Sequence, residues 1–417
     1  MTTIEQMARD AKQAARLLAA ASGTARAKAL DAMADKLLQA KDELFAANAL
    51  DIAAAREAGV ADAFLKRLEV NEKIFGYMVR RLQEAAALPD PVGRILSGRT
   101  MPSGLKVSKV SVPLGVVAII YEARPNVTSD AAAVALKSAN AVILKGGSES
   151  IRSNRVIVRA MREAIIEAGL PENSLQFIDS TEHTAVAELL KQDKYIDVVI
   201  PRGGKSLIKA VSEGGRIPVI KHYDGICHQY VAATADFDMA VKIVINSKTD
   251  RVEVCNALET LLVDAKIAAD FLPIMCQTFK EKGVEIRGCE RTCAIVSDIK
   301  PATAEDWDTE YLAPIISIKV VDGVEEATEH IAEHGSGHTD GIVTSNLEEA
   351  RQFTALVDSA SVLINASTRL SGGGDYGMGA VVGISTDKLH ARGPVGPEEL
   401  CSYKWIAEGN GHLRLKM

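Results

Sequence analysis

One cysteine in this sequence stands where a nucleophile is easy to place. Cys255 follows the polar, charged run 247–253 and precedes the mostly apolar run 257–263, which has the pattern of a strand. This position predicts a partly exposed thiol in a loop at the mouth of a sheet. A thiolate there can attack an acyl or carbonyl carbon and hold it as a covalent intermediate. A single cysteine taken alone is more often structural, so the other motifs must decide.

Two glycine-containing loops have the composition of phosphate-binding turns. The first is Lys145-Gly-Gly-Ser148, and the second runs over residues 201–206 and contains Gly203, Gly204 and Lys205. Glycines before a helix N-terminus let an anionic phosphate approach the exposed backbone N–H groups. The second loop lacks the Walker spacing, and the first half of the chain has no complete G-x-G-x-x-G, so an ordinary Rossmann fingerprint is absent. A plain glycine turn stays open as the alternative.

Composition narrows the class of protein. The chain has 417 residues, which predicts two or three domains, and its 47% apolar and 25% charged residues are typical of a soluble globular protein. A net charge of −7 without a basic block argues against nucleic acid as a partner. No run has the length of a membrane-spanning helix, and the N-terminus lacks the order of a signal peptide. The six scattered cysteines do not form a disulfide framework, so we expect a cytoplasmic protein.

The order of elements predicts an α/β fold. Residues 1–88 carry apolar side chains at helical spacing, and loose alternation over 105–112 indicates a hairpin-like strand pair. Buried strands separated by helices then predict a doubly wound sheet, at 113–120, 141–144, 175–178 and 197–200. A second α/β unit begins near Val231. Ligands of open α/β sheets bind beyond the carboxyl ends of the strands, which is where segments 122–126, 145–148 and 201–206 fall.

Five motifs occur in order along the chain. The longest covers residues 321–342 and contains His334-Gly-Ser-Gly-His338. The others are Tyr-Glu-Ala-Arg-Pro-Asn at 121–126, Ile-Pro-Arg-Gly-Gly-Lys at 200–205, Val-Cys-Asn at 254–256 with Glu-Thr at 259–260, and Leu-His-Ala-Arg-Gly-Pro at 389–394. Together they resemble the aldehyde dehydrogenase superfamily and, within it, the γ-glutamyl phosphate reductase family. The resemblance covers essentially the whole chain.

The resemblance implies an aldehyde dehydrogenase-like architecture with three parts. Residues 1–230 would form a Rossmann-like NADP-binding domain, and residues 231–365 a catalytic domain that bears the cysteine. A small β oligomerisation flap would combine a hairpin at 102–120 with the tail 366–417, which would also return to the cofactor domain. A homo-oligomer, dimer or tetramer, is therefore expected.

The resemblance also implies a reaction. NADPH would reduce L-glutamyl 5-phosphate to glutamate 5-semialdehyde with release of phosphate, and the product would cyclise to 1-pyrroline-5-carboxylate in proline biosynthesis. The glutamate kinase that makes the substrate would be a functional partner. Cys255 would form a thioester, with its own N–H and the Asn126 side chain as oxyanion donors. The doubly anionic substrate would be anchored by Arg124, His338, Lys388 and Arg392, each of which taken alone is more often a solvated charge or a satisfied histidine.

The cofactor assignment rests on residues that match the superfamily. In relatives that use NAD, a glutamate three residues after the lysine bonds the adenosine ribose. Ser148 stands there, which leaves room for a 2′-phosphate with Lys145 as its counter-ion. The resemblance also places Gly203, Gly204 and Lys205 near the pyrophosphate, and Glu310 on the nicotinamide ribose. No metal site is predicted, since Cys289 and Cys293 have no nearby histidine or further cysteine pair.

One departure favours a reductase over a hydrolytic relative. Hydrolytic aldehyde dehydrogenases carry a glutamate before the cysteine that activates water against the thioester, and the corresponding segment 221–228 has none. Asp224 could act as that base, so a hydrolytic enzyme stays open as the alternative. A non-catalytic nucleotide-binding relative is a third candidate, which the joint presence of Cys255, Lys145 and Glu310 disfavours.

Overall fold

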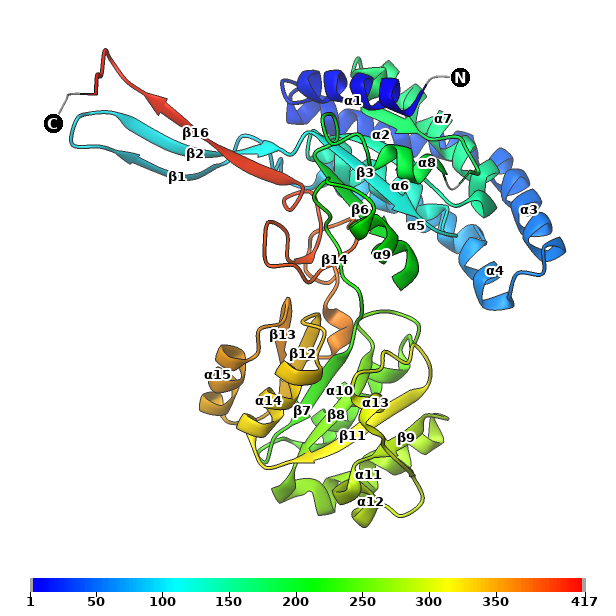
Figure 1. Cartoon of the computed structure of the whole chain (residues 1–417), viewed down its shortest axis with the longest axis vertical. Coiled ribbons are helices and arrows are strands. Elements are labelled where there is room, and N and C mark those ends of the chain that lie inside the picture. The colour runs from blue at the N-terminus through cyan, green and yellow to red at the C-terminus, as the bar shows by residue number, and fades with distance from the viewer. Residues whose placement is uncertain (1–2, 183, 415–417) are drawn as a thin grey trace.

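The computed structural model describes residues 3–182 and 184–414. Two parallel sheets, each flanked by helices, form an upper and a lower half, and an antiparallel arm projects sideways from the upper half (Figure 1). The α/β class predicted from the alternation of apolar runs and helical segments is confirmed.

The chain begins with helices, as the spacing of its apolar residues predicts. They are α1 (Ile4–Leu18), α2 (Gly23–Gln39), α3 (Lys41–Glu57), α4 (Asp62–Leu68) and α5 (Glu72–Ala87). The Thr3, Ser22 and Asn71 side chains accept N–H groups at the starts of α1, α2 and α5, which satisfies otherwise unpaired donors. Among the described residues, no helix is both long and apolar enough to cross a membrane.

The upper sheet has four parallel strands in the order β5-β4-β3-β6. Its strands are β3 (Val116–Tyr121), β4 (Ala141–Lys145), β5 (Leu175–Phe177) and β6 (Val198–Arg202). Its helices are α6 (Asn126–Lys137), α7 (Ile151–Glu167), α8 (Thr184–Leu189) and α9 (Lys205–Glu213), with short 3-10 turns η1 (Ser148–Ser150) and η2 (Glu172–Ser174). From β3 the chain adds β4 and β5 on one side and then β6 on the other. The crevice between the carboxyl ends of β3 and β6 is therefore a topological switch point, where such sheets bind ligands.

The lower sheet has seven parallel strands in the order β10-β9-β11-β8-β7-β12-β13. They are β7 (Cys227–Val231), β8 (Leu258–Asp264), β9 (Glu285–Gly288), β10 (Lys300–Pro301), β11 (Ile315–Val321), β12 (Thr339–Val343) and β13 (Ser361–Ile364). The helices are α10 (Phe237–Thr249), α11 (Ala265–Glu281), α12 (Glu290–Ile295), α13 (Ala304–Trp307), α14 (Val324–His334) and α15 (Leu347–Leu356). A domain boundary at 230/231 would cut β7, so the lower unit begins before residue 227 and not at 231.

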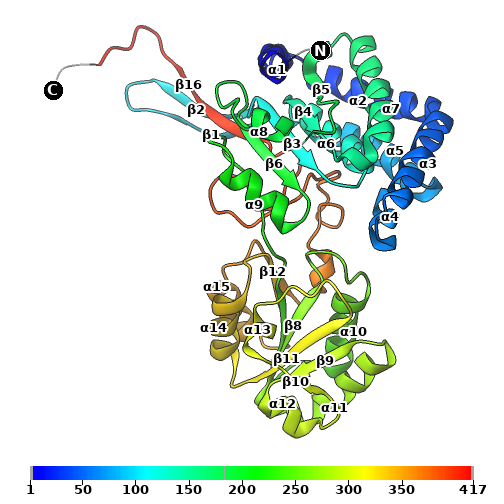
Figure 2. The same ribbon diagram turned by 45° about the vertical axis from the view of Figure 1, so that its right-hand side comes forward.

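The arm consists of three antiparallel strands, β1 (Ile95–Thr100), β2 (Lys106–Pro113) and β16 (Cys401–Glu408). Figure 2 shows β16 lying along β2 from one end to the other. The hairpin predicted at 102–120 is misplaced, because β1 precedes it and β3 belongs to the upper sheet. All six β1 residues are exposed, so this strand has no alternating apolar pattern to reveal it.

The tail between the two halves contains η3 (Thr368–Leu370) and two short strands, β14 (Ile384–Ser385) and β15 (Gly393–Pro394). Its buried apolar residues complete the core of the upper half; they are Ala380, Val382, Ala391, Val395 and Leu400. The chain thus leaves the upper half before β7 and returns to it after β13 (Figure 1).

A buried ion pair holds the loop that contains Cys255. Lys248 on α10 donates to Glu259 on β8 at 2.6 Å, and both side chains are fully buried. The second Glu259 oxygen accepts the Leu312 N–H at 3.3 Å, which ties in the loop before β11. Burial raises the pKa of Glu259 to about 7, and Lys248 opposes that rise. Each charge is tolerated there because the other compensates it.

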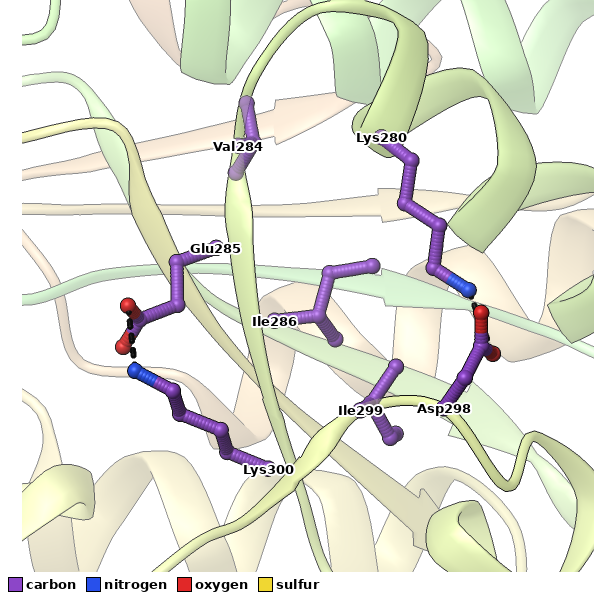
Figure 3. A pocket seen from close by; sticks show the side chains of 7 residues that line it. All are labelled: Lys280, Val284, Glu285, Ile286, Asp298, Ile299 and Lys300. Carbon is purple, nitrogen blue, oxygen red and sulfur yellow. Dashed lines mark hydrogen bonds and ion pairs between the residues drawn. The ribbon is translucent and has the colours of Figure 1, made fainter.

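This pair generates a prediction about stability. Lys248→Met leaves the Glu259 carboxylate buried without a cation, so we expect urea denaturation to show a loss of about 3–5 kcal/mol in the free energy of unfolding. The double variant Lys248→Met/Glu259→Leu should recover much of that loss. The control is Lys280→Met, which removes the ion pair with Asp298 (Figure 3); Asp298 is exposed, so the expected change is below about 1 kcal/mol. Equal losses for the two single variants would contradict the prediction.

Candidate active site

Cys255 lines a cleft of about 330 Å³ between the two halves. The upper half contributes the loop after β3 and the loop after β6, and the lower half contributes loops that lead into its strands. The Cys255 side chain is partly exposed, as expected for a loop at the mouth of a sheet. A thiol in this position is open to a bound molecule.

The two sheets meet the cleft with opposite edges. Glu122 and Arg202 lie at the carboxyl ends of β3 and β6, in agreement with the rule for open sheets. In the lower half the functional loops precede their strands, since Cys255 comes before β8, Glu310 before β11 and His338 before β12. The lower sheet therefore uses its amino edge, which the carboxyl-end rule does not predict.

The backbone around Cys255 is fixed by very close packing against Gly225. A Cβ atom at residue 225 would lie 1.8 Å from the Cys255 carbonyl oxygen, so only glycine fits there. The Gly225 N–H donates to Glu310 Oε1 at 2.9 Å, and the Cys227 thiol donates to the Cys255 carbonyl at 3.3 Å. Burial raises the pKa of Cys227, which keeps that thiol protonated as a donor. The Cys255 thiol thus sits on a rigid backbone.

Two guanidinium groups line the cleft that contains the Cys255 thiol. Arg124 and Arg202 line the same cleft, and burial followed by the charge of Arg202 lowers the pKa of Arg124 to about 10. Burial also lowers the pKa of Arg202, while the charge of a Cys255 thiolate opposes this. Both arginines remain charged at neutral pH, so this end of the cleft favours an anion. Sequence reasoning missed Arg202, although its place at the end of a buried strand, before two glycines, was a usable signal.

The turn that presents Arg124 is unusual. Ala123 has φ of 37°, a left-handed conformation that is uncommon for a residue with a side chain, and its N–H donates to Glu149 Oε1 at 2.7 Å. Asn126 follows this turn as the first residue of α6, and its amide donates to Asp130 Oδ2 at 3.2 Å. Arg124 lines the cleft that contains Cys255 and Asn126 is not among its lining residues, so the role of Asn126 as oxyanion donor stays a prediction.

Several residues predicted to bind the cofactor lie at the switch-point crevice. Gly203, Gly204, Lys205 and Glu310 line the cleft, and Gly204 immediately precedes α9. The Gly204 N–H donates to Glu122 Oε2 at 2.9 Å, so a carboxylate already occupies an anion-accepting position there. A Cβ at Gly204 would meet nothing closer than 4.0 Å, which leaves open space beside the backbone. These observations fit the phosphates of a nucleotide.

The other predicted cofactor residues end the neighbouring strand. Lys145 is buried at the carboxyl end of β4, and its Nζ donates to the Gly146 carbonyl at 2.7 Å. Burial lowers the pKa of Lys145. Ser148 begins η1 and is exposed, and its Oγ lies 3.4 Å from Glu149 Oε2. Neither residue is among those that line the cleft around Cys255.

Two histidines flank Cys255. The metal-binding atoms of His222, Cys255 and His338 all lie within 4.8 Å of one another, and the two rings are 5.4 Å apart. His222 Nδ1 lies 2.9 Å from the Ile384 carbonyl, to which it can only donate, so its Nε2 is left free to accept a proton. Burial lowers the pKa of His338 to about 4, so this ring is neutral at neutral pH. Sequence reasoning missed His222, which stands in the segment that lacks the hydrolytic glutamate.

Two predicted substrate anchors lie outside the cleft lining. Lys388 and Arg392 both form ion pairs with Asp358, and the Arg392 Nη1 to Asp358 Oδ1 distance is 2.8 Å. These bonds lower the pKa of Asp358. The two basic residues therefore neutralise a carboxylate of the lower half and are not brought to Cys255.

A second hollow, of about 370 Å³, lies at the β9–β10 edge of the lower sheet (Figure 3). Its charged side chains are already paired, Lys300 with Glu285 at 2.7 Å and Lys280 with Asp298 at 2.5 Å. Ile286 and Ile299 form the apolar part between them. This hollow contains no nucleophile or unpaired base among its lining residues, so the cleft at Cys255 is the candidate active site.

Comparison with known proteins agrees with this geometry. A sequence model of the aldehyde dehydrogenase family matches residues 1–287. The crystal structure of γ-glutamyl phosphate reductase from Thermotoga maritima is 43% identical, with coverage of 99% of this chain and 100% of that chain and a TM-score of 0.96. The Saccharomyces cerevisiae γ-glutamyl phosphate reductase is 31% identical over the full length of both chains, with a TM-score of 0.56.

A more distant structure shares the fold alone. The acetylating aldehyde dehydrogenase from Geobacillus thermoglucosidasius is 22% identical, covers 99% of this chain and 98% of that chain, and has a TM-score of 0.69. The family match over more than half of the chain and the full-length similarity to two reductases lead to one conclusion. This chain belongs to the aldehyde dehydrogenase family, among the γ-glutamyl phosphate reductases.

Proposed function

We propose that this chain reduces L-glutamyl 5-phosphate with NADPH to glutamate 5-semialdehyde and phosphate, a step of proline biosynthesis. The observation that carries the proposal is the pair of guanidinium groups, Arg124 and Arg202, in the same cleft as the partly exposed Cys255 thiol. An acyl phosphate needs a nucleophile and an acceptor for the departing phosphate, and this cleft offers both. Similarity to two γ-glutamyl phosphate reductases gives the same substrate.

The acylation step follows from the residues around the thiol. His222 Nε2 accepts the Cys255 proton, because its Nδ1 is committed to the Ile384 carbonyl. The thiolate then attacks the 5-carbonyl carbon, so that an S–C bond forms and the C–O bond to phosphate breaks. Arg124 and Arg202 stabilise the oxyanion and the leaving phosphate. The product of this step is a thioester on Cys255.

The cofactor would lie along the switch-point crevice. Gly203, Gly204 and Lys205 would hold its pyrophosphate at the start of α9, Glu310 its nicotinamide ribose, and Lys145 with Ser148 its adenosine end. Aldehyde dehydrogenases use NAD(P), and an engineered relative of this fold has been solved with NADP+ bound. NADPH is favoured because Ser148 carries no charge and Glu149 is bonded to the Ala123 N–H. When bound, NADPH supplies the hydride that converts the thioester to the aldehyde.

The hydrolytic alternative is less well supported. Asp224, the only base that the sequence left open for this role, forms an ion pair with Lys205. An acid-forming enzyme would need that carboxylate free to activate water. Lys388 and Arg392 form ion pairs with Asp358 and are not among the residues that line the cleft, so their role as substrate anchors stays a prediction from the sequence. A cytoplasmic location and coupling to a glutamate kinase remain predictions from the sequence.

The decisive experiment measures the reverse reaction. With glutamate 5-semialdehyde and NADP+, we expect NADPH to appear only when phosphate or arsenate is present. One of these oxyanions must accept the acyl group of the thioester for turnover to continue. Cys255→Ala should abolish turnover while NADPH binding persists, and Cys293→Ala on α12 is the matched control with turnover retained. NADPH formation without phosphate or arsenate would identify a hydrolytic enzyme, and turnover by Cys255→Ala would reject the nucleophile.

The arginine pair yields a second prediction. Arg124→Gln removes a charged donor to the phosphate, so the KM for phosphate in the reverse reaction should rise about 10- to 100-fold, equivalent to about 1.5–3 kcal/mol. Arg202→Gln should behave similarly. Arg67→Gln is the control, because Arg67 lines the same cleft but is exposed at its rim. The assignment fails if Arg124→Gln raises this KM no more than Arg67→Gln does.

We also propose that the arm mediates a homo-oligomer. It is a three-stranded sheet that carries exposed large apolar side chains; they are Ile95, Leu96, Tyr403, Trp405 and Ile406. Small sheets require an apolar face covered by another element to be stable in water. The free edges of β1 and β16 also present unpaired backbone groups that a second chain can bond. A second copy of this chain is the partner that would cover both.

A charged substitution in the arm should lower the mass of the assembly. Trp405→Asp places a charge on the exposed apolar side of β16, so we expect analytical ultracentrifugation to show a smaller species than the unchanged protein at micromolar concentration. Lys404→Ala, at the neighbouring position with its side chain toward the other face, should keep the original mass. An unchanged mass for Trp405→Asp, or a monomeric unchanged protein, would contradict the proposed interface.

A further inference from the structure

Cys255 and the two histidines beside it form a group with the composition of a metal site. His222, Cys255 and His338 come from three separate loops, which lead into β7, β8 and β12. One ligand atom from each residue lies within 4.8 Å of the others. Two imidazole nitrogens and one thiolate are a ligand set that Zn²⁺ prefers, with a fourth position left for water.

We propose that His222, Cys255 and His338 form an inhibitory site for Zn²⁺ or a similar borderline-soft divalent cation. The site goes beyond the reductase function, since it does not require the acyl phosphate or the cofactor. Tetrahedral Zn²⁺ with these bond lengths needs ligand atoms about 3.5 Å apart. The three atoms lie within 4.8 Å of one another, so small side-chain rotations bring them to that separation.

An unpartnered nitrogen supports the site independently. His338 is fully buried, and its Nε2 has no hydrogen-bond partner among the described residues. A buried polar atom without a partner is unfavourable, and a metal ion would satisfy it. His338 Nδ1 lies 2.8 Å from Thr339 Oγ1, whose hydroxyl bonds onward to Ser371 Oγ. This outer contact orients the ring as the second shell of a zinc site does.

The other two ligands are also held in place. The Ile384 carbonyl fixes the tautomer of His222, so that Nε2 is the available ligand atom. The Gly225 contact fixes the Cys255 backbone. Glu310, which lines the same cleft, adds a negative charge that favours a cation, whereas Arg124 and Arg202 oppose one. An anion bound between the arginines would reduce that opposition, so metal and phosphate can occupy the cleft together.

A metal ion bound at this site would inhibit the reaction at Cys255. Metal binding forms an S–metal bond, and the Cys255 thiol proton leaves to solvent. The same sulfur orbital can no longer attack an acyl carbon, so metal and thioester exclude each other. The inhibition is reversible, because removal of the ion restores the free thiol.

The test uses Co²⁺ as a spectroscopic probe of the full-length protein freed of metal. One equivalent of Co²⁺ should produce thiolate-to-metal charge-transfer absorption in the near ultraviolet and intense visible bands of a four-coordinate ion. Cys255→Ser should remove the charge-transfer absorption, and His338→Gln should weaken Zn²⁺ binding at least tenfold in competition with a chromophoric chelator. Cys293→Ser and His412→Gln, on α12 and beyond β16, are matched thiol and imidazole controls that should bind as the unchanged protein does.

The outcomes separate the site from the enzyme's function. Charge-transfer absorption that persists in Cys255→Ser, or equal Zn²⁺ affinity in His338→Gln, would overturn the proposal. His222→Gln gives a second imidazole test should His338→Gln fail to fold, and equal affinity there would also overturn it. Inhibition by Zn²⁺ without a Co²⁺–thiolate signal would place the metal elsewhere and reject the site. These binding signals do not depend on catalysis, so a failed reductase assay leaves them readable.

Discussion

The contact between Gly225 and the Cys255 carbonyl is the constraint on which the active site depends. With only a hydrogen on residue 225, the two backbones come closer than any side chain allows. The Gly225 N–H also donates to Glu310, so one glycine fixes the Cys255 backbone and a predicted cofactor contact together. The Lys248–Glu259 pair acts one layer deeper, where it holds the two loops that bear these residues. Packing, and not flexibility, thus defines where the thiol stands.

The two sheets contribute different groups to the cleft because they face it with opposite edges. The upper sheet offers its carboxyl edge, with glycines, a helix start and arginines suited to anions. The lower sheet offers its amino edge, where Cys255, His222 and His338 converge. Because the edges face each other, a molecule bound at the switch point must lie against the thiol. Neither sheet contains a complete site.

The sequence predicted the parts of this structure that depend on local pattern. The buried strand β3 is a continuous apolar run and β8 is mostly apolar, and Cys255 between a charged and an apolar run had the signature of a loop. Contacts between distant segments left no such signature. Arg124 lines the cleft and Asn126, two residues further on, is not among its lining residues, a difference that the sequence pattern does not reveal. Lys388 and Arg392 looked free in the sequence because Asp358, some thirty residues away, is the partner that binds them.

The path of the tail has a consequence for how the protein is made. Residues 227–364 form the lower sheet from one continuous stretch, so this half can fold as soon as it leaves the ribosome. The upper half is synthesised first, yet Val395 and Leu400 belong to its core and β16 completes its arm. A two-stranded β1–β2 hairpin without β16 is at best marginally stable. The half that emerges first is therefore completed last, and assembly of the arm has to wait until β16 has left the ribosome.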